Sequence, residues 1–282
     1  MSKPVCITAD STCDLSEELL RRFDIRVIPL TITLGEETFP DGTSFTPYDM
    51  YRRFRADGVL PKTSAPSIAE FYGFFSAMTE AGCEVVHLDI SGELSSSVNN
   101  AVLAARELNG VYVVDSRMLS TGLGLLAIEG AECRDKGMSA AEIAAHLTEL
   151  TGKVDTSFVL DTLAYMQKGG RCSNIAVLGA NLLKLKPALE MSGGKLGIYK
   201  KYRGSIEQVY RDYMRERLRG KKIRPGHVFI TDSGEVPETL YPELDALVRE
   251  YVDAREIHHT LAGCTVSTHC GPGTLGVLFI NE

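Results

Sequence analysis

Short apolar runs alternate with longer amphipathic segments along almost the whole chain, and this alternation limits the fold more than any other feature. The first unit shows the pattern: an apolar run at 5–9 predicts a buried strand, and a predicted helix follows it over 15–23. That helix carries four apolar residues on one stripe, namely Leu15, Leu19, Leu20 and Phe23. Strands that alternate with helices in this way predict an α/β protein.

The same pattern continues through both halves of the chain. Up to Gly152 it predicts strands over 26–34, 84–90 and 111–114 and helices over 46–55, 68–81, 95–108, 121–136 and 140–150. After Gly152 it predicts strands over 156–160, 196–203, 227–231, 256–261 and 275–280 and helices over 163–167, 174–183, 206–219 and 237–251. A polar turn at 192–195 separates two apolar stretches, so we expect a β-hairpin and a mixed sheet in the second half.

Length and charge exclude several classes of protein. A chain of 282 residues is long enough for about two domains, and we expect the boundary near Gly152. Lys and Arg number 30 against 37 Asp and Glu, and the net charge of −7 argues against a general affinity for nucleic acid or anionic membranes. No apolar run reaches the ~18 residues of a membrane span. Residues 1–4 lead directly into a short apolar run, so we expect no signal peptide and a cytoplasmic location.

The cysteines argue against disulfides and metal. There are seven, they are scattered along the chain, and no Cys-x-x-Cys pair occurs. We therefore expect reduced thiols and neither a disulfide framework nor a structural zinc site.

Three local patterns suggest chemistry but have simpler explanations. The Gly122–Ala127 segment matches G-x-G-x-x-A, yet residues 115–121 separate it from the preceding strand, so we expect close helix packing and no dinucleotide cofactor. Lys168-Gly-Gly-Arg171 is either an anion-binding loop or a helix C-cap. No G-x-S-x-G elbow is present, but catalytic triads assemble in space, so a hydrolase that uses a serine and His269 stays open as an alternative.

Three loops share clustered hydroxyl groups or a histidine. They cover 63–67, 94–97 and 268–273. Loops of an α/β protein gather at one end of the sheet, where ligands bind. Hydroxyl groups, imidazole N–H groups and free helix amides are the donors that a carboxylate or phosphate oxygen needs. We therefore expect these loops to form one anion-binding site.

Seven short motifs, taken in order, resemble the DegV family of fatty-acid-binding proteins, and the resemblance covers residues 5–280. They are Asp10-Ser-Thr-Cys-Asp-Leu15, Thr63-Ser-Ala-Pro-Ser67, Ile90-Ser-Gly-Glu-Leu-Ser-Ser96, Val113-Val-Asp-Ser116, Lys168-Gly-Gly-Arg171, Leu185-Lys-Pro187 and Thr268-His-Cys-Gly-Pro-Gly273. The resemblance implies an N-terminal parallel-sheet α/β domain (1–152) and a C-terminal α/β domain with a mixed sheet (153–282). One long-chain fatty acid binds between them, with no metal, cofactor or catalytic residue of the protein's own.

The resemblance also implies which residues bind the fatty acid. Thr63, Ser95 and His269 hold the carboxylate, and Ser64 and Ser96 are neighbours that share this role. The acyl chain runs into the C-terminal domain, where each buried CH₂ contributes about 0.8 kcal/mol. Its candidate lining residues are Phe158, Val159, Leu160, Ile175, Ala176, Val177, Leu178, Leu182 and Leu183.

The resemblance implies a partner as well. Some family members present the fatty acid to a separate ATP-binding kinase subunit, which phosphorylates it to an acyl phosphate for phospholipid synthesis, and an acyltransferase is a further candidate partner. Lys168, Arg171 and Arg203 are our candidates for contacts with the kinase subunit or the phosphate. A passive fatty-acid carrier or sensor remains the other alternative, beside the hydrolase.

Overall fold

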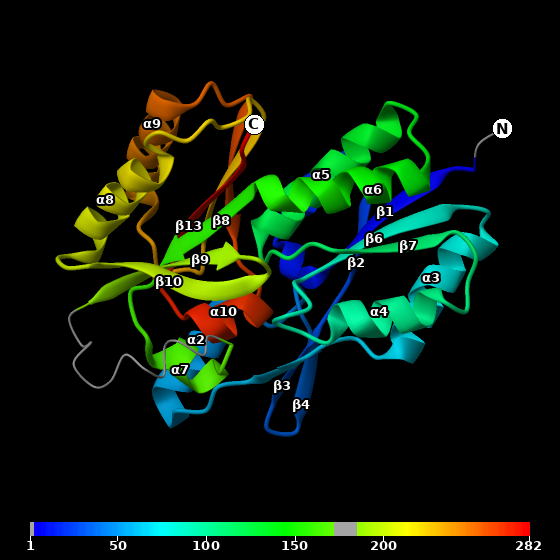
Figure 1. Cartoon of the computed structure of the whole chain (residues 1–282). Coiled ribbons are helices and arrows are strands. Elements are labelled where there is room, and N and C mark those ends of the chain that lie inside the picture. The colour runs from blue at the N-terminus through cyan, green and yellow to red at the C-terminus, as the bar shows by residue number, and fades with distance from the viewer. Residues whose placement is uncertain (1–2, 172–184) are drawn as a thin grey trace.

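The computed structural model describes residues 3–171 and 185–282, and Figure 1 shows their arrangement. Two sheets with helices packed around them make up the two halves of the chain, and a small third sheet lies near their junction. The predicted helix over 174–183 lies outside the described residues. No helix in the described ranges is long and apolar enough to span a bilayer.

The first half is built on a parallel sheet with the strand order β2-β1-β6-β7. Its strands are β1 (Val5–Asp10), β2 (Ile25–Ile28), β6 (Glu84–Asp89) and β7 (Val111–Asp115). Its helices are α1 (Glu17–Arg22), α3 (Ile68–Glu80), α4 (Ser97–Ala105), α5 (Thr121–Asp135) and α6 (Ala140–Leu150), and α3 and α4 lie on the opposite side of the sheet from α5 and α6. The parallel sheet places the loops after β1, β6 and β7 at one edge, which is where ligands bind in this class of fold.

Helix α5 joins the two halves. It is buried almost all round and contacts β1 and β6 of the first sheet as well as β8 and β13 of the second. Its glycines permit this approach, because a Cβ on Gly122 would lie 2.1 Å from Thr156 Oγ1 and one on Gly124 would lie 2.8 Å from the Cys13 carbonyl oxygen. The G-x-G-x-x-A segment is therefore a close-packing helix.

The second half is built on a mixed sheet with the strand order β10-β9-β8-β13-β11-β12, as predicted. Its strands are β8 (Val154–Val159), β9 (Lys186–Ser192), β10 (Lys195–Tyr202), β11 (His227–Asp232), β12 (Glu256–Leu261) and β13 (Leu275–Ile280). Only β11 and β12 pair in parallel, and β9 and β10 form the predicted hairpin. The α-helices in the described part of this half are α7 (Ala164–Gly169), α8 (Ile206–Leu218), α9 (Tyr241–Tyr251) and α10 (Cys264–Cys270).

The change from the first sheet to the second falls between α6 and β8. Helix α6 ends at Leu150 and β8 begins at Val154, with a short 3₁₀ turn at Thr151–Lys153 between them. A domain boundary at residues 152 and 153 remains a prediction.

Two predicted segments were wrong. The single strand over 26–34 is two strands, because Pro29 has no N–H to donate to a ladder and the chain leaves the first sheet there. The second part, β3 (Thr31–Leu34), forms a small antiparallel sheet with β4 (Glu37–Pro40) and β5 (Lys62–Ser64). Helix α2 (Pro47–Asp57) lies between β4 and β5 in the chain. The predicted loop over 268–273 begins inside α10, which contacts α2, β3 and β5.

Candidate functional site

A cleft of about 660 Å³ lies where the two halves meet. Its walls come from the loop after β6, from β5, α7 and α10, and from the start of β10, so segments far apart in the sequence form one surface. The polar lining residues are Thr63, Ser64, Glu93, Ser95, Ser96, Arg171, Thr265 and His269. All five residues that were predicted to bind the carboxylate therefore line this cleft. Of the three predicted cations, Arg171 lines it as well.

His269 lies on α10, and two buried carboxylates hold the start of this helix in place. Asp14 Oδ1 accepts a hydrogen bond of 2.8 Å from the Gly263 N–H, and Asp41 Oδ1 accepts one of 3.3 Å from the Thr265 N–H. At the other end of the helix, His269 Nε2 lies 3.3 Å from Thr63 Oγ1 on β5. Donor and acceptor in this pair depend on the ring tautomer.

The His269 ring is neutral at ordinary pH. Burial, together with the smaller effect of the positive charge of Arg171, lowers its pKa to about 4. Its Nδ1 is buried without a hydrogen-bond partner in the described part of the chain. No carboxylate among residues 3–171 and 185–282 bonds to the ring. A serine hydrolase needs an acid that orients its histidine, so this arrangement does not favour the hydrolase alternative.

Gly169 provides the space for the His269 ring. A Cβ on Gly169 would lie 2.2 Å from His269 Nδ1, far inside van der Waals contact. The following residue, Gly170, ends α7 in the left-handed conformation with a φ of 67°. The segment from Lys168 to Arg171 is therefore a helix C-cap, one of the two interpretations that its sequence allows.

The serines come from the loop that follows β6. Asp89 Oδ1 accepts a 2.7 Å hydrogen bond from Ser97 Oγ, and Ser95 Oγ accepts one of 3.2 Å from the Ser97 N–H. These bonds fix the start of α4, so Ser95 and Ser96 are held at the cleft wall. The hydroxyl of Ser91, in the same loop, donates a 2.6 Å hydrogen bond to the Gly194 carbonyl of the hairpin turn. This bond connects the two walls of the cleft.

The three predicted cations lie in different places. Arg171 lines the cleft and donates a 2.8 Å hydrogen bond to the Gly169 carbonyl. Lys168 donates a 3.2 Å hydrogen bond to the Gly58 carbonyl and lies over the Phe54 ring, outside the cleft. Arg203 is exposed just after β10 and does not line the cleft.

The apolar lining differs from the predicted one. Val159 and Leu160 are fully buried in the packed core, whereas Phe158 lines a small adjoining cavity of about 20 Å³ that shares Leu119 and Val266 with the cleft. The candidates between Ile175 and Leu183 lie outside the described residues. The cleft itself is lined by apolar residues that sequence reasoning missed, namely Leu30, Ile90, Leu94, Leu119, Met166, Leu196 and Val266.

Two of these apolar lining residues could have been found from their position next to strands. Ile90 directly follows β6, and Leu30 lies between β2 and β3, so both stand where strands end. Thr265 also escaped the sequence analysis, although its buried hydroxyl has no partner among the described residues and it lines the cleft. Burial raises the pKa of the neighbouring Cys270 thiol to about 12, so this residue is a protonated packing group.

Among the described residues that line the cleft, no three metal-ligating side chains come together. In the described ranges, sets of three metal-ligating side chains occur only away from the cleft. The described lining offers hydroxyl groups, a neutral imidazole and one guanidinium beside an apolar wall, and its carboxylate, Glu93, is exposed and paired with Lys195 at 3.7 Å. Such a surface suits an anionic head group attached to an apolar body.

Comparison with known proteins agrees with a ligand of this kind. The sequence model of the DegV family, whose members are described as uncharacterised, matches residues 4–282. A fatty acid-binding protein of Thermotoga maritima is 32% identical over 282 residues, an alignment that covers 96% of each chain. The structure of a DegV family protein from Thermus thermophilus, which binds fatty acid, superposes with a TM-score of 0.88 at 30% identity and covers 99% of this chain and 100% of that one.

A stearic acid-binding protein from Eubacterium ventriosum has a TM-score of 0.82 at 26% identity and covers 100% of this chain and 98% of that one. These structures share the two-domain α/β fold, with one parallel and one mixed sheet. The chain therefore belongs to the DegV family.

Proposed function

We propose that this protein binds one long-chain fatty acid in the cleft, with the carboxylate at Thr63, Ser95 and His269. The observation that supports this most is the lining of the cleft, in which hydroxyl groups and a neutral imidazole stand beside an apolar wall. A volume of about 660 Å³ falls within the range of roughly 300–1,000 Å³ that is typical of ligand sites. Relatives that align with nearly the full length of this chain are named as fatty-acid-binding proteins.

The head-group residues suit a carboxylate. A carboxylate only accepts hydrogen bonds, and hydroxyl groups and one N–H of a neutral imidazole donate them. Hydrogen bonds to a charged partner contribute about 1.5–3 kcal/mol each. Ser64 and Ser96 lie beside Thr63 and Ser95 in the cleft wall and supply further donors.

The acyl chain supplies most of the binding free energy in this proposal. Each methylene that leaves water contributes about 0.8 kcal/mol, so a long chain outweighs the head group several-fold. The apolar wall and the adjoining small cavity, which reaches Phe158 and Leu278, lead toward the second half of the chain. This direction agrees with an acyl chain housed by the C-terminal domain.

A binding comparison between two ligands tests the head-group assignment. Delipidated protein is titrated with a long-chain fatty acid and with the alcohol of the same chain length. We expect the acid to bind more tightly than the alcohol, and we expect His269→Ala to remove most of that difference. Equal affinity for acid and alcohol would contradict a carboxylate site at these residues.

We further propose that the protein presents the bound acid to a separate ATP-binding kinase subunit. The head-group end is accessible, because Ser64, Ser96 and Arg171 line the cleft and are exposed. A carboxylate oxygen held there attacks the γ-phosphorus of ATP on the partner, and the products are an acyl phosphate and ADP. The acyl phosphate then enters phospholipid synthesis, with an acyltransferase as the next partner.

An assay with the kinase subunit distinguishes this proposal from a passive carrier or sensor. Loaded protein, the kinase subunit and ATP are incubated with hydroxylamine, which traps acyl phosphate. We expect Arg171→Ala to retain fatty acid but to lose product, with smaller effects from Lys168→Ala and Arg203→Ala. A wild-type protein that binds fatty acid and yields no acyl phosphate would be a passive carrier.

A further inference from the structure

Two clusters of metal-ligating side chains lie away from the cleft, around the C-terminal part of α5. One consists of His227, Glu256 and His258, and the other of Glu129, Cys133 and His146. In each cluster the possible ligand atoms lie within 4.8 Å of one another. The two differ in what already occupies those atoms.

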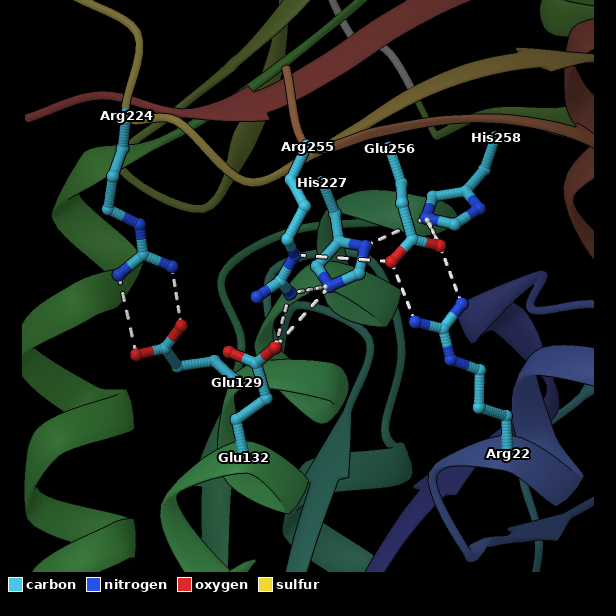
Figure 2. Close-up of polar contacts among 8 residues, drawn as sticks. All are labelled: Arg22, Glu129, Glu132, Arg224, His227, Arg255, Glu256 and His258. Carbon is cyan, nitrogen blue, oxygen red and sulfur yellow. Dashed lines mark hydrogen bonds and ion pairs between the residues drawn. The ribbon is translucent and has the colours of Figure 1, made fainter. Parts of the chain in front are cut away.

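Guanidinium groups occupy the first cluster, as Figure 2 shows. Arg22 donates to both oxygens of Glu256, at 2.5 and 2.6 Å, and Arg255 Nη2 lies 2.5 Å from His227 Nε2. The remaining nitrogen of His227, Nδ1, is 2.8 Å from His258 Nε2. Two positive charges in direct contact with the ligand atoms oppose the approach of a dication. This cluster is therefore satisfied as a hydrogen-bonded network.

The second cluster has a different arrangement. Glu129 and Cys133 are four residues apart on α5, so both side chains lie on one face of the helix. His146 comes from the neighbouring helix α6, and its Nε2 lies 3.0 Å from Glu129 Oε1. The Arg224 guanidinium holds the other oxygen, Oε2, and lies 3.3 Å from Oε1 (Figure 2). The one guanidinium bonds to the carboxylate only, and in the described residues no hydrogen bond or ion pair joins an arginine or lysine to His146 or Cys133.

We propose that Glu129 Oε1, Cys133 Sγ and His146 Nε2 form a binding site for a thiophilic divalent cation such as Zn²⁺. A carboxylate, a thiolate and an imidazole are three of the ligands that zinc takes, and a water molecule would complete a tetrahedron. Two ligand atoms at roughly 2.1 Å from zinc are about 3.4 Å apart in a tetrahedron, so Oε1 and Nε2, which lie 3.0 Å apart in a hydrogen bond, need to separate by about 0.4 Å to bind the ion.

The surroundings of the cluster fit this role. Glu129 and Cys133 are buried, whereas the His146 side chain is 38% exposed and gives the ion a route from solvent. Arg224 acts as the outer partner that orients a ligating carboxylate. On binding, the Cys133 thiol loses its proton to the buffer and the thiolate bonds to the metal, while the His146 ring binds through an unprotonated Nε2 and carries its proton on Nδ1.

Metal titration of the full-length protein tests this site. Zinc is added to chelator-treated protein in competition with a chromophoric chelator, and Co²⁺ serves as a spectroscopic probe. We expect one ion per chain, a thiolate-to-cobalt charge-transfer band, and a rise in melting temperature with added Zn²⁺. We expect Cys133→Ala and His146→Ala each to weaken Zn²⁺ binding at least about tenfold and to abolish the rise in melting temperature.

Matched variants separate this site from the alternatives. Cys83→Ala removes a partly buried thiol outside both clusters, and His258→Ala disrupts the first cluster. Both variants should bind Zn²⁺ like the wild type. Because the His146 side chain is 38% exposed, we expect His146→Ala to fold even if the loss of the buried Cys133 thiol disturbs packing. No zinc uptake at micromolar concentrations would overturn the proposal, as would uptake that survives Cys133→Ala or that depends on His258.

Discussion

Gly169 lies directly against the His269 ring: a Cβ at this position would approach Nδ1 to 2.2 Å. The contact joins α7 to α10, and it fixes the distance between the ring and the C-capped end of α7. Since His269 faces Thr63 with its other nitrogen, the glycine sets where the imidazole stands in the cleft. Gly169 touches no ligand, yet it positions His269, which binds the carboxylate in the proposed function.

Gly169→Ala should therefore weaken fatty-acid binding at least about tenfold, because the ring must move from its position beside Thr63. Gly73→Ala is the matched control, since Gly73 is also helical and a Cβ there meets nothing within 4 Å. That control should bind normally and gain up to ~1 kcal/mol of stability from helix propensity. Equal affinities of the two variants in a fatty-acid titration would show that Gly169 does not position the site.

The pKa of His269 predicts a pH dependence of stability. Burial lowers this pKa from 6.5 to about 4, so the unfolded state binds a proton more readily than the folded state. The contribution of the neutral His269 ring to the free energy of unfolding is present in full above pH 6.5, and it is lost as the pH falls toward 4. Each pKa unit corresponds to about 1.4 kcal/mol, so delipidated wild type should lose ~2–3 kcal/mol more than His269→Gln between pH 7 and pH 4.5. Parallel stability curves in denaturant titrations of the two proteins would refute a buried neutral imidazole.

Thr63→Val keeps the shape of the side chain and removes its hydroxyl. The loss of one hydrogen bond to a charged group should weaken fatty-acid binding about tenfold or more. Affinity for the alcohol of the same chain length should fall much less. Thr33→Val is a suitable control, because Thr33 lies on the neighbouring strand β3 and does not line the cleft. An unchanged affinity of Thr63→Val for the acid would exclude this hydroxyl from the head-group site.

Ser91→Ala should speed the release of bound fatty acid. Its hydroxyl donates the 2.6 Å hydrogen bond to the Gly194 carbonyl that connects the loop after β6 to the hairpin turn. A net loss of ~0.5–1.5 kcal/mol corresponds to dissociation that is roughly twofold to tenfold faster. Ser76→Ala, which removes a hydroxyl bonded only within α3, should leave the rate unchanged. Stopped-flow release of a fluorescent fatty acid measures both, and identical rates would exclude this bond as a restraint on the cleft.

The strands and helices with clear periodicity could be predicted from the sequence. Strand β13 begins and ends at the predicted residues, and the turn at Gly193 and Gly194, both with positive φ, forms the expected hairpin. The strand over 26–34 was wrong because the apolar pattern runs through Pro29 without a change of period, although the chain changes sheet there. Periodicity reports burial, and burial is the same in either sheet.

Helix α10 could not be predicted for a different reason. Its seven residues contain three β-branched side chains, and nearly all are buried, so the segment shows neither helix propensity nor an amphipathic stripe. The carboxylates that cap its start, Asp14 and Asp41, are more than 200 residues away in the chain. The motif residues Thr63, Ser95 and His269 could be placed in one site, whereas the apolar lining depends on tertiary packing that no local pattern encodes.

Mass spectrometry of the purified protein tests the central claim most directly. The intact protein is measured under native conditions, and the extract released by organic solvent is analysed for lipids. We predict one long-chain fatty acid per chain in the wild type and reduced retention in His269→Ala. A ligand-free protein that also fails to take up added fatty acids would contradict the proposed function.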